Sequence, residues 1–352
     1  MKILAPNLYK IILTNKNMRT SSRNLYIIKG SERSLMIDTS WNVPECLSEM
    51  EQALNELSID CRNLDIFVTH NHVDHSGYVS FFTDRGARAF MNPVEIAASS
   101  DRYHRFYEDN DMRRSYTSEV GVTKERTPDA WQEIKAGADQ LARDNNVNFD
   151  FPFTPIAPGD RLSYGGYDFE VVSLAGHTSG QCGLVERNAK LFFCADQVIL
   201  GLVPIVITSG KDQHLLTEYF VSLRELASDY SGYRFLPGHY GEFTEIKEET
   251  DRIIAGYGER CTQLRQVLAD DSPGTRPGAL HPAHADLPLL LPVLLSPHLA
   301  KALFLPRLAF RDRCDRPHGK GRSFVLVSPV TPIRCARSSP PPLSSRTRTR
   351  SN

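Results

Sequence analysis

Residues Thr69–Gly77 have the sequence THNHVDHSG and follow the apolar run Ile66–Val68. Three histidines and one aspartate thus lie close together, directly after a segment with the composition of a buried strand. Imidazole and carboxylate groups are ligands for zinc and its first-row neighbours. The H-x-H-x-D-H spacing therefore predicts a metal site on the loop after this strand. A polar turn with unrelated histidines is the weaker interpretation, because the chain has only 11 histidines.

The bulk composition is that of an ordinary globular protein. The chain has 352 residues, of which 41% are hydrophobic, so it can bury a sizeable core and has the length of two domains. Its first residues lack the pattern of a secretory signal. The most apolar run, 287–295, is broken by Pro288 and Pro292 and falls far short of the roughly 20 residues of a membrane helix. We expect no membrane partner.

Cysteine usage indicates a reducing compartment. The seven cysteines are an odd, scattered set without a C-x-x-C pair. Disulfide frameworks of secreted proteins show even counts at regular spacing. We therefore predict reduced thiols and a cytoplasmic location.

The elements around the motif alternate between strand and helix. Strands are predicted at 24–28 and 34–37, followed by a helix at 45–57. Next come the strand that leads into the motif and a further strand at 87–91. This order predicts an α/β fold. A segment rich in charge at 101–148 is expected to be a helical insertion that covers the metal cleft and shapes the choice of substrate.

The second half supplies three more potential ligands at strand ends. Strands are predicted at 167–174, 182–186, 190–194 and 234–236, and polar motifs follow the first and the last two of them. Loops at one edge of a sheet system converge in space, so these side chains should meet the first motif. The combined donors are too many for one tetrahedral ion and suit two ions that share a carboxylate. They are His70, His72, Asp74, His75, His177, Asp196 and His239.

Five ordered motifs resemble those of the metallo-β-lactamase fold superfamily. They are D-T-S from Asp38, H-x-H-x-D-H at 70–75, G-H-T-S-G at 176–180, A-D at 195–196 and P-G-H at 237–239. The similarity extends over roughly residues 20–245 and implies an αββα sandwich with metals at one end. An aspartate at position 196 is similar to the glyoxalase II and lactonase-type branch. Zinc β-lactamases usually lack it, which argues against antibiotic hydrolysis.

The resemblance also implies how the donors divide between two ions. The first ion would be held by His70, His72 and His177. The second would be held by Asp74, His75 and His239, and Asp196 would bridge the two. Two Zn²⁺ ions are expected, with iron or manganese as alternatives.

Three further roles concern single residues. Asp74 is the candidate catalytic group that orients a metal-bridging hydroxide or passes its proton to the leaving group. Asp38 is expected behind the ligands, where a carboxylate fixes an imidazole tautomer or a loop, and a solvated aspartate is the alternative. Tyr240 is a candidate for substrate binding, and a packing role is equally compatible with its position.

The predicted reaction is hydrolysis of a small ester, thioester or lactone by a binuclear zinc enzyme. One alternative is an iron-dependent oxidoreductase of the same fold, such as a persulfide dioxygenase. His72 argues against di-iron relatives, which typically have glutamate at this position. The other alternative is a metal-dependent nuclease. Nucleic acid is an unfavoured partner, because residues 1–274 carry 28 of the 41 basic and 39 of the 42 acidic residues. A homodimer is left open.

The C-terminal part differs in composition from the rest. Residues 1–250 form the predicted hydrolase domain and 251–274 a C-terminal helix. The segment 246–272 resembles the first helix of a winged-helix-like C-terminal domain seen in some superfamily members. Residues 275–352 contain 13 Lys and Arg against 3 Asp, no Glu and 12 of the 22 prolines. Their composition predicts a disordered basic tail. Its abrupt onset suggests the hypothesis of a frameshifted product, which an intact reading frame at the locus would refute.

Overall fold

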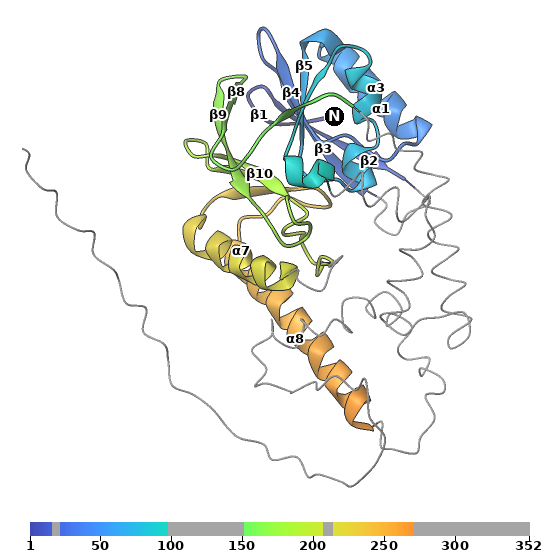
Figure 1. Ribbon diagram of the computed structural model, residues 1–352. Helices are drawn as coiled ribbons and strands as arrows, with labels where there is room; N and C mark the ends of the chain where they lie inside the picture. The colour runs from blue at the N-terminus through green and yellow to red at the C-terminus, as the bar shows by residue number, and fades with distance from the viewer. Residues whose placement is uncertain (16–21, 98–150, 207–213, 271–352) are drawn as a thin grey trace, which may run out of the picture.

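The computed structural model describes residues 1–15, 22–97, 151–206 and 214–270. Two β-sheets pack face to face, with helices on both outer sides (Figure 1). The insertion predicted at 101–148 and the tail predicted at 275–352 lie outside the described residues.

The first sheet has seven strands in sequence order, β1 to β7. They are β1 (Lys2–Ala5), β2 (Leu8–Thr14), β3 (Ser22–Ile28), β4 (Ser34–Ile37), β5 (Leu64–Val68), β6 (Arg88–Met91) and β7 (Phe153–Pro155). The strands from β1 to β4 pair antiparallel, whereas β4, β5, β6 and β7 are parallel neighbours. A short 3₁₀ helix (Cys61–Asn63) leads into β5.

The second sheet has five strands in the order β12-β11-β10-β9-β8. They are β8 (Arg161–Tyr164), β9 (Tyr167–Ser173), β10 (Cys182–Glu186), β11 (Leu191–Ala195) and β12 (Arg234–Pro237). All pairs are antiparallel except β11 with β12. Both β11 and β12 therefore end at the same edge of this sheet.

Helices cover the outer face of each sheet. The first sheet carries α1 (Pro44–Glu56) and α3 (Val79–Thr83), and the second carries α7 (Leu215–Asp229) and α8 (Ile246–Asp270). Figure 1 shows the two pairs of helices on opposite sides of the strands. The predicted C-terminal helix corresponds to α8, which begins at Ile246, and its side chains Ile253 and Tyr257 belong to the core between this helix and the second sheet.

Strand β3 shows why the sequence forms a sandwich. Successive side chains of a strand point to opposite faces. Leu25 and Ile27 enter the core beneath α1, whereas Tyr26 and Ile28 enter the core between the sheets. Because both faces are buried, the strand is apolar on both sides, and the expected αββα sandwich follows.

The strand ends converge as the sequence predicted. β4 and β5 run parallel and lead into Asp38 and the histidine loop, and β11 and β12 lead into Asp196 and His239. The sequence did not predict β1, β2 or α7. In the described residues, no helix is long and apolar enough to cross a membrane.

Candidate metal centre

A short helix shapes the loop after β5. α2 (Val73–Ser76) begins directly after His72, and the N–H groups of His75 and Ser76 donate to the His72 carbonyl at 2.9 and 3.0 Å. This turn keeps the histidines of the loop close together. Rings of His70 and His75 lie with their centroids 3.9 Å apart.

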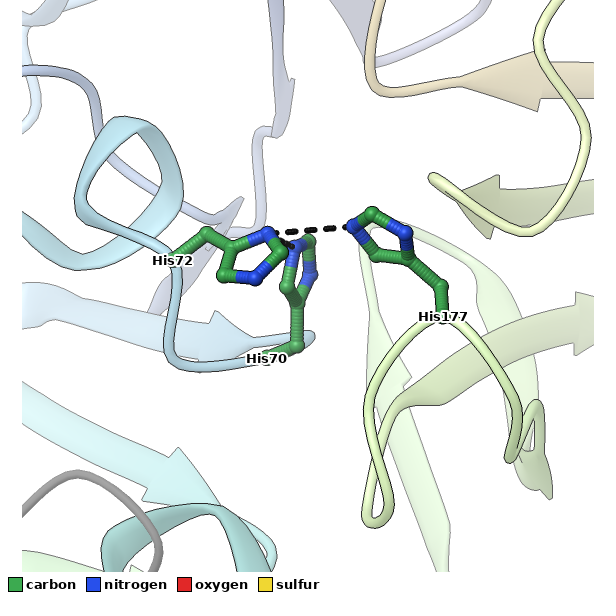
Figure 2. A group of neighbouring side chains, drawn as sticks. All are labelled: His70, His72 and His177. Atoms are coloured by element: carbon green, nitrogen blue, oxygen red, sulfur yellow. Dashed lines mark hydrogen bonds between the residues drawn. The ribbon is translucent and has the colours of Figure 1, made fainter. Parts of the chain in front are cut away.

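Three imidazoles meet at one side of the site. His70 Nε2 lies 3.1 Å from His72 Nδ1, and His177 Nε2 lies 3.0 Å from the same atom (Figure 2). His70 and His72 come from the loop after β5, whereas His177 comes from the loop after β9. The two sheets thus each contribute ring nitrogens to one point.

Contacts on the outer side of the rings fix their tautomers. His177 Nδ1 lies 2.7 Å from the Ile205 carbonyl, and His239 Nδ1 lies 2.6 Å from the Ser22 carbonyl. A carbonyl only accepts, so Nδ1 carries the hydrogen and the Nε2 atom of each neutral ring presents its lone pair inward. Facing lone pairs repel each other unless a cation lies between them. This arrangement is typical of metal ligands.

Carboxylates join the histidines at the other side of the site. Asp74 Oδ2 lies 3.2 Å from His239 Nε2 and 3.7 Å from His75 Nε2. One potential ligand atom from each of these three residues lies within 4.8 Å of the others, as is also true of His70, His72 and His177. The two groups are those that the resemblance assigned to separate ions.

Asp196 lies between the two groups. Its Oδ1 is 3.4 Å from His75 Nε2, and its Oδ2 is 3.4 Å from His239 Nε2 and 3.8 Å from His177 Nε2. It also forms a third close set of potential ligands with His70 and His75. A carboxylate in this position can contact ions in both groups.

Two buried polar atoms of this cluster indicate whether the donors suit a cation. Among the described residues, His75 Nε2 and Asp196 Oδ1 are buried without a hydrogen-bond partner. Such groups cost about 1–3 kcal/mol each unless another partner satisfies them. A Cβ at Gly238 would lie 2.3 Å from Asp196 Oδ1, so the chain leaves no side chain there. The donors therefore fit divalent metal ions.

Burial and charge act in opposite directions on the histidines. Burial lowers the pKa of His70 and of His177 and keeps these rings neutral, as ligation requires. Burial also opposes a charge on His239, but Asp196 and Asp74 outweigh it and raise the pKa of His239 to about 10. The carboxylates thus favour positive charge at this point, and a metal that binds there would displace a proton.

Asp38 connects the ligand loop to the strand behind it. Its Oδ2 accepts from His75 Nδ1 at 2.9 Å, and the same carboxylate accepts from the N–H and hydroxyl of Thr69 at 2.7 and 2.9 Å. The Thr69 hydroxyl also lies 3.0 Å from His70 Nδ1. Asp38 therefore orients one imidazole directly and reaches a second one through Thr69.

A buried arginine holds three parts of the site together. Arg23 is 0% exposed, and its guanidinium donates to Asp38 Oδ2 at 2.5 Å, to the Asp74 carbonyl at 2.7 Å and to the Gly238 carbonyl at 2.8 Å. The planar, multiply donating guanidinium suits such a junction. Arg23 was not among the predicted site residues, although a charged residue beside the apolar run of β3 could have indicated a buried ion pair.

A buried glutamate connects the two histidine loops. Glu95 Oε2 accepts from the N–H of Asn71 at 2.9 Å, and Oε1 accepts from the N–H of Gly180 at 2.6 Å. The side chain is 0% exposed. It holds the loop of His70 beside the loop of His177. Sequence analysis missed it too, because a single glutamate after a strand carries no distinctive pattern.

Tyr240 lies next to the site. It follows His239, its ring centroid is 6.4 Å from that of His239, and its side chain is 40% exposed. Its φ is 60°, a left-handed conformation that non-glycine residues adopt rarely. Its role in substrate binding stays a prediction.

The family follows from the sequence match. The profile of the metallo-beta-lactamase superfamily matches residues 18–239, and the chain belongs to this superfamily. The predicted αββα fold is confirmed, and so is a metal-dependent hydrolase as the class of enzyme. The fold implies divalent metal ions, for which the histidine and aspartate groups offer sites. The narrower assignment to the glyoxalase II and lactonase-type branch stays a prediction.

Relatives and solved structures agree with the family. Acyl-coenzyme A thioesterase MBLAC2 from Bos taurus and from Homo sapiens are each 26% identical over 241 residues, which cover 66% of this chain and 78% of the relative. The metallo-beta-lactamase family protein TTHA1429 from Thermus thermophilus has a TM-score of 0.65 at 22% identity, covering 86% of this chain and 92% of that one. A beta-lactamase domain protein from Burkholderia ambifaria has a TM-score of 0.63 at 17% identity, covering 75% and 76%. These structural similarities show the fold alone.

Proposed function

We propose that this protein is a binuclear zinc-dependent hydrolase whose substrates are acyl thioesters, within the wider class of small esters, thioesters and lactones. The observation that carries the proposal is the convergence of three close sets of potential ligands around Asp196. The MBLAC2 relatives, which are acyl-coenzyme A thioesterases, favour a thioester over the other two substrate types.

The proposal assigns the donors to two ions. His70, His72 and His177 bind the first, Asp74, His75 and His239 bind the second, and Asp196 bridges them. The distances around Asp196 support this division, because its carboxylate oxygens lie within 3.8 Å of nitrogens from both sets. All seven side chains offer nitrogen or oxygen, which suits zinc and is also compatible with iron or manganese.

When bound, two divalent ions supply Lewis acidity and make water nucleophilic near neutral pH. Asp74 is the proposed proton carrier of the site. Its side chain is 16% exposed, against 8% for Asp196, so it is the carboxylate with more access to an incoming substrate. Its Oδ2 also lies 3.2 Å from His239 Nε2, so both atoms are close enough to share one cation. A thiol leaving group has a pKa near 8.5, so it needs little help from a proton donor.

The metal content of the purified full chain tests the metal assignment. We expect about two zinc ions per chain, and iron with no zinc would instead favour the oxidoreductase. His72→Ala should remove metal and most turnover together, because it deletes the nitrogen shared by His70 and His177. The matched control is His214→Ala, an exposed histidine at the start of α7. Unchanged metal in His72→Ala would contradict the assignment.

A substrate panel tests the reaction. Turnover of an acyl thioester, a lactone, a simple ester and a phosphodiester is compared at equal metal loading. We expect the thioester to have the highest kcat/KM. Preference for the phosphodiester would favour a nuclease and contradict the proposal.

A cytoplasmic location is part of the proposal. The five cysteines within the described residues are free, namely Cys46, Cys61, Cys182, Cys194 and Cys261. Free thiols are compatible with a reducing compartment. Cell fractionation tests the location, and recovery of the chain in a secreted fraction would refute it.

A further inference from the structure

Exposed apolar side chains lie on two loops next to the candidate metal centre. Among the described residues, nine large hydrophobic side chains are exposed, and four of them are Leu200 (39%), Leu202 (36%), Ile205 (41%) and Tyr240 (40%). The first three lie on the loop 199–206, which follows β11, and Tyr240 follows His239. We call these four residues the apolar lip.

The loop of the lip is held through its backbone by α8. Arg252 Nη2 donates to the carbonyls of Ile199 and Leu202 at 3.3 and 2.6 Å, and the N–H of Gly201 donates to Glu249 Oε2 at 3.3 Å. These bonds satisfy polar groups of the loop and leave its leucine side chains at the surface. The exposure of Leu200 and Leu202 is therefore part of an ordered arrangement.

Contacts at both ends of the lip lead to the metal ligands. The hydroxyl of Tyr257 donates to the Pro204 carbonyl at 2.6 Å, and the next carbonyl, that of Ile205, accepts from His177 Nδ1 at 2.7 Å. Leu200 Cδ2 lies 3.4 Å from the position a Cβ would take on Gly241, the residue after Tyr240. The lip thus extends along the site between the loops of His177 and His239.

The uncharged side chains of the lip favour an apolar ligand. Its four side chains carry no charge, and the neighbouring Arg252 and Glu249 bind each other at 2.6 Å as well as the loop backbone. An apolar ligand covering these side chains gains free energy in proportion to the apolar surface that it removes from water. Exposed apolar side chains close to a site are typical of ligand or partner binding.

We propose that the apolar lip binds the acyl chain of the substrate and makes the enzyme prefer long acyl groups over acetyl. This inference rests on the proposed thioesterase function and adds the part of the substrate that selects it. The lip adjoins the loops of His177 and His239, so an acyl chain bound to these side chains would lie next to two of the candidate metal ligands.

The test compares acyl chain lengths in the metal-loaded full chain. The double variant Leu200→Gln/Leu202→Gln keeps the side-chain size and places polar groups in the lip. Its control is Val221→Gln, because Val221 is 46% exposed on α7 and is not one of the four residues of the lip. The ratio of kcat/KM for dodecanoyl-coenzyme A to that for acetyl-coenzyme A should fall about tenfold or more in the double variant. The control should keep the ratio of the unmodified chain.

A binding measurement separates the lip from the reaction. Dodecanoate is titrated calorimetrically into the unmodified chain and the double variant. If no thioester is hydrolysed by the unmodified chain, the proposed function fails, yet weaker dodecanoate binding by the double variant still supports the lip. An unchanged chain-length ratio, or equal dodecanoate affinity, overturns the lip proposal. A dimer that the double variant converts to a monomer also overturns it, because the lip would then cover a second copy of the chain.

Discussion

Two buried aspartates at opposite ends of the central strands bind arginine in similar ways but have different neighbours. Asp65, near the start of β5, accepts from Arg33 and Arg88 and from the hydroxyl of Tyr164. Asp38, after the end of β4, accepts from Arg23 and from ring nitrogen Nδ1 of His75.

The difference lies in what each carboxylate orients. Arg88 and Tyr164 join β6 and β8 to Asp65 on β5, and Arg33 also donates to the carbonyls of Arg62 and Leu64, so the group stabilises the sandwich. The His75 ring bound to Asp38 has its other nitrogen buried in the metal centre without a hydrogen-bond partner among the described residues. A buried aspartate with an arginine is therefore no sign of function by itself. Function depends on whether one of its partners has a second polar atom directed at a site.

The largest effect is expected from adding a methyl group at Gly238, which lies against Asp196. Gly238→Ala brings a Cβ to within 2.3 Å of Asp196 Oδ1 and 2.7 Å of Arg23 Nη1, so we expect loss of bound metal and of activity. Gly258→Ala is the control, because no atom lies within 4 Å of its Cβ and alanine favours the helix by up to about 1 kcal/mol. Metal analysis checks both variants, and full metal content in Gly238→Ala would contradict the close packing.

The second prediction exchanges each aspartate for asparagine. Asp38→Asn removes the charge and replaces one carboxylate oxygen with an NH2 donor, so the side chain cannot accept from His75, Arg23 and both donors of Thr69 together. We expect metal affinity about 10–100-fold weaker, as for other groups that orient a ligand. Asp65→Asn should keep the metal affinity. Competition with a chromogenic chelator measures both, and equal losses would remove the distinction between the two ends.

The smallest expected effect is the pH dependence of stability at Asp65. Burial opposes its charge, but Arg88, Arg33 and Tyr164 outweigh it and lower the pKa of Asp65 from 3.8 to about 2. Because the folded pKa is depressed, this stabilisation is present above pH 3.8 and is lost as the pH falls through about 2. It amounts to about 2 kcal/mol at neutral pH.

Urea unfolding between pH 5 and 2 of metal-free protein checks this pH dependence. Asp65→Asn should unfold with a weaker pH dependence in this window than the unmodified chain. A matching dependence in both would show that Asp65 is not the responsible group. The control is Ile12→Gln, unfolded over the same pH range, which should show the same pH dependence of stability as the unmodified chain.

Local patterns allowed much of the fold to be predicted. Strands β4 and β10 have the bounds expected from sequence, because short apolar runs between turn residues specify strands strongly. Strands β1 and β2 were missed. Lys10 and the exposed Ile12 interrupt the alternation of β2, and only the tertiary structure buries Lys10, whose amine binds Glu242 at 3.3 Å.

The sequence by itself determined the candidate donors of the centre, because residue types at fixed spacing and at strand ends depend on local chemistry. Only the tertiary structure decided what holds these donors. The site receives contacts from distant parts of the chain, namely from Arg23, Glu95 and the carbonyls of Ser22 and Ile205. A contact made by a backbone carbonyl cannot be predicted from residue type. The apolar lip is of the same kind: leucines at 200 and 202 are ordinary core residues by composition, and only the folded structure leaves them exposed on a loop that α8 binds through its backbone.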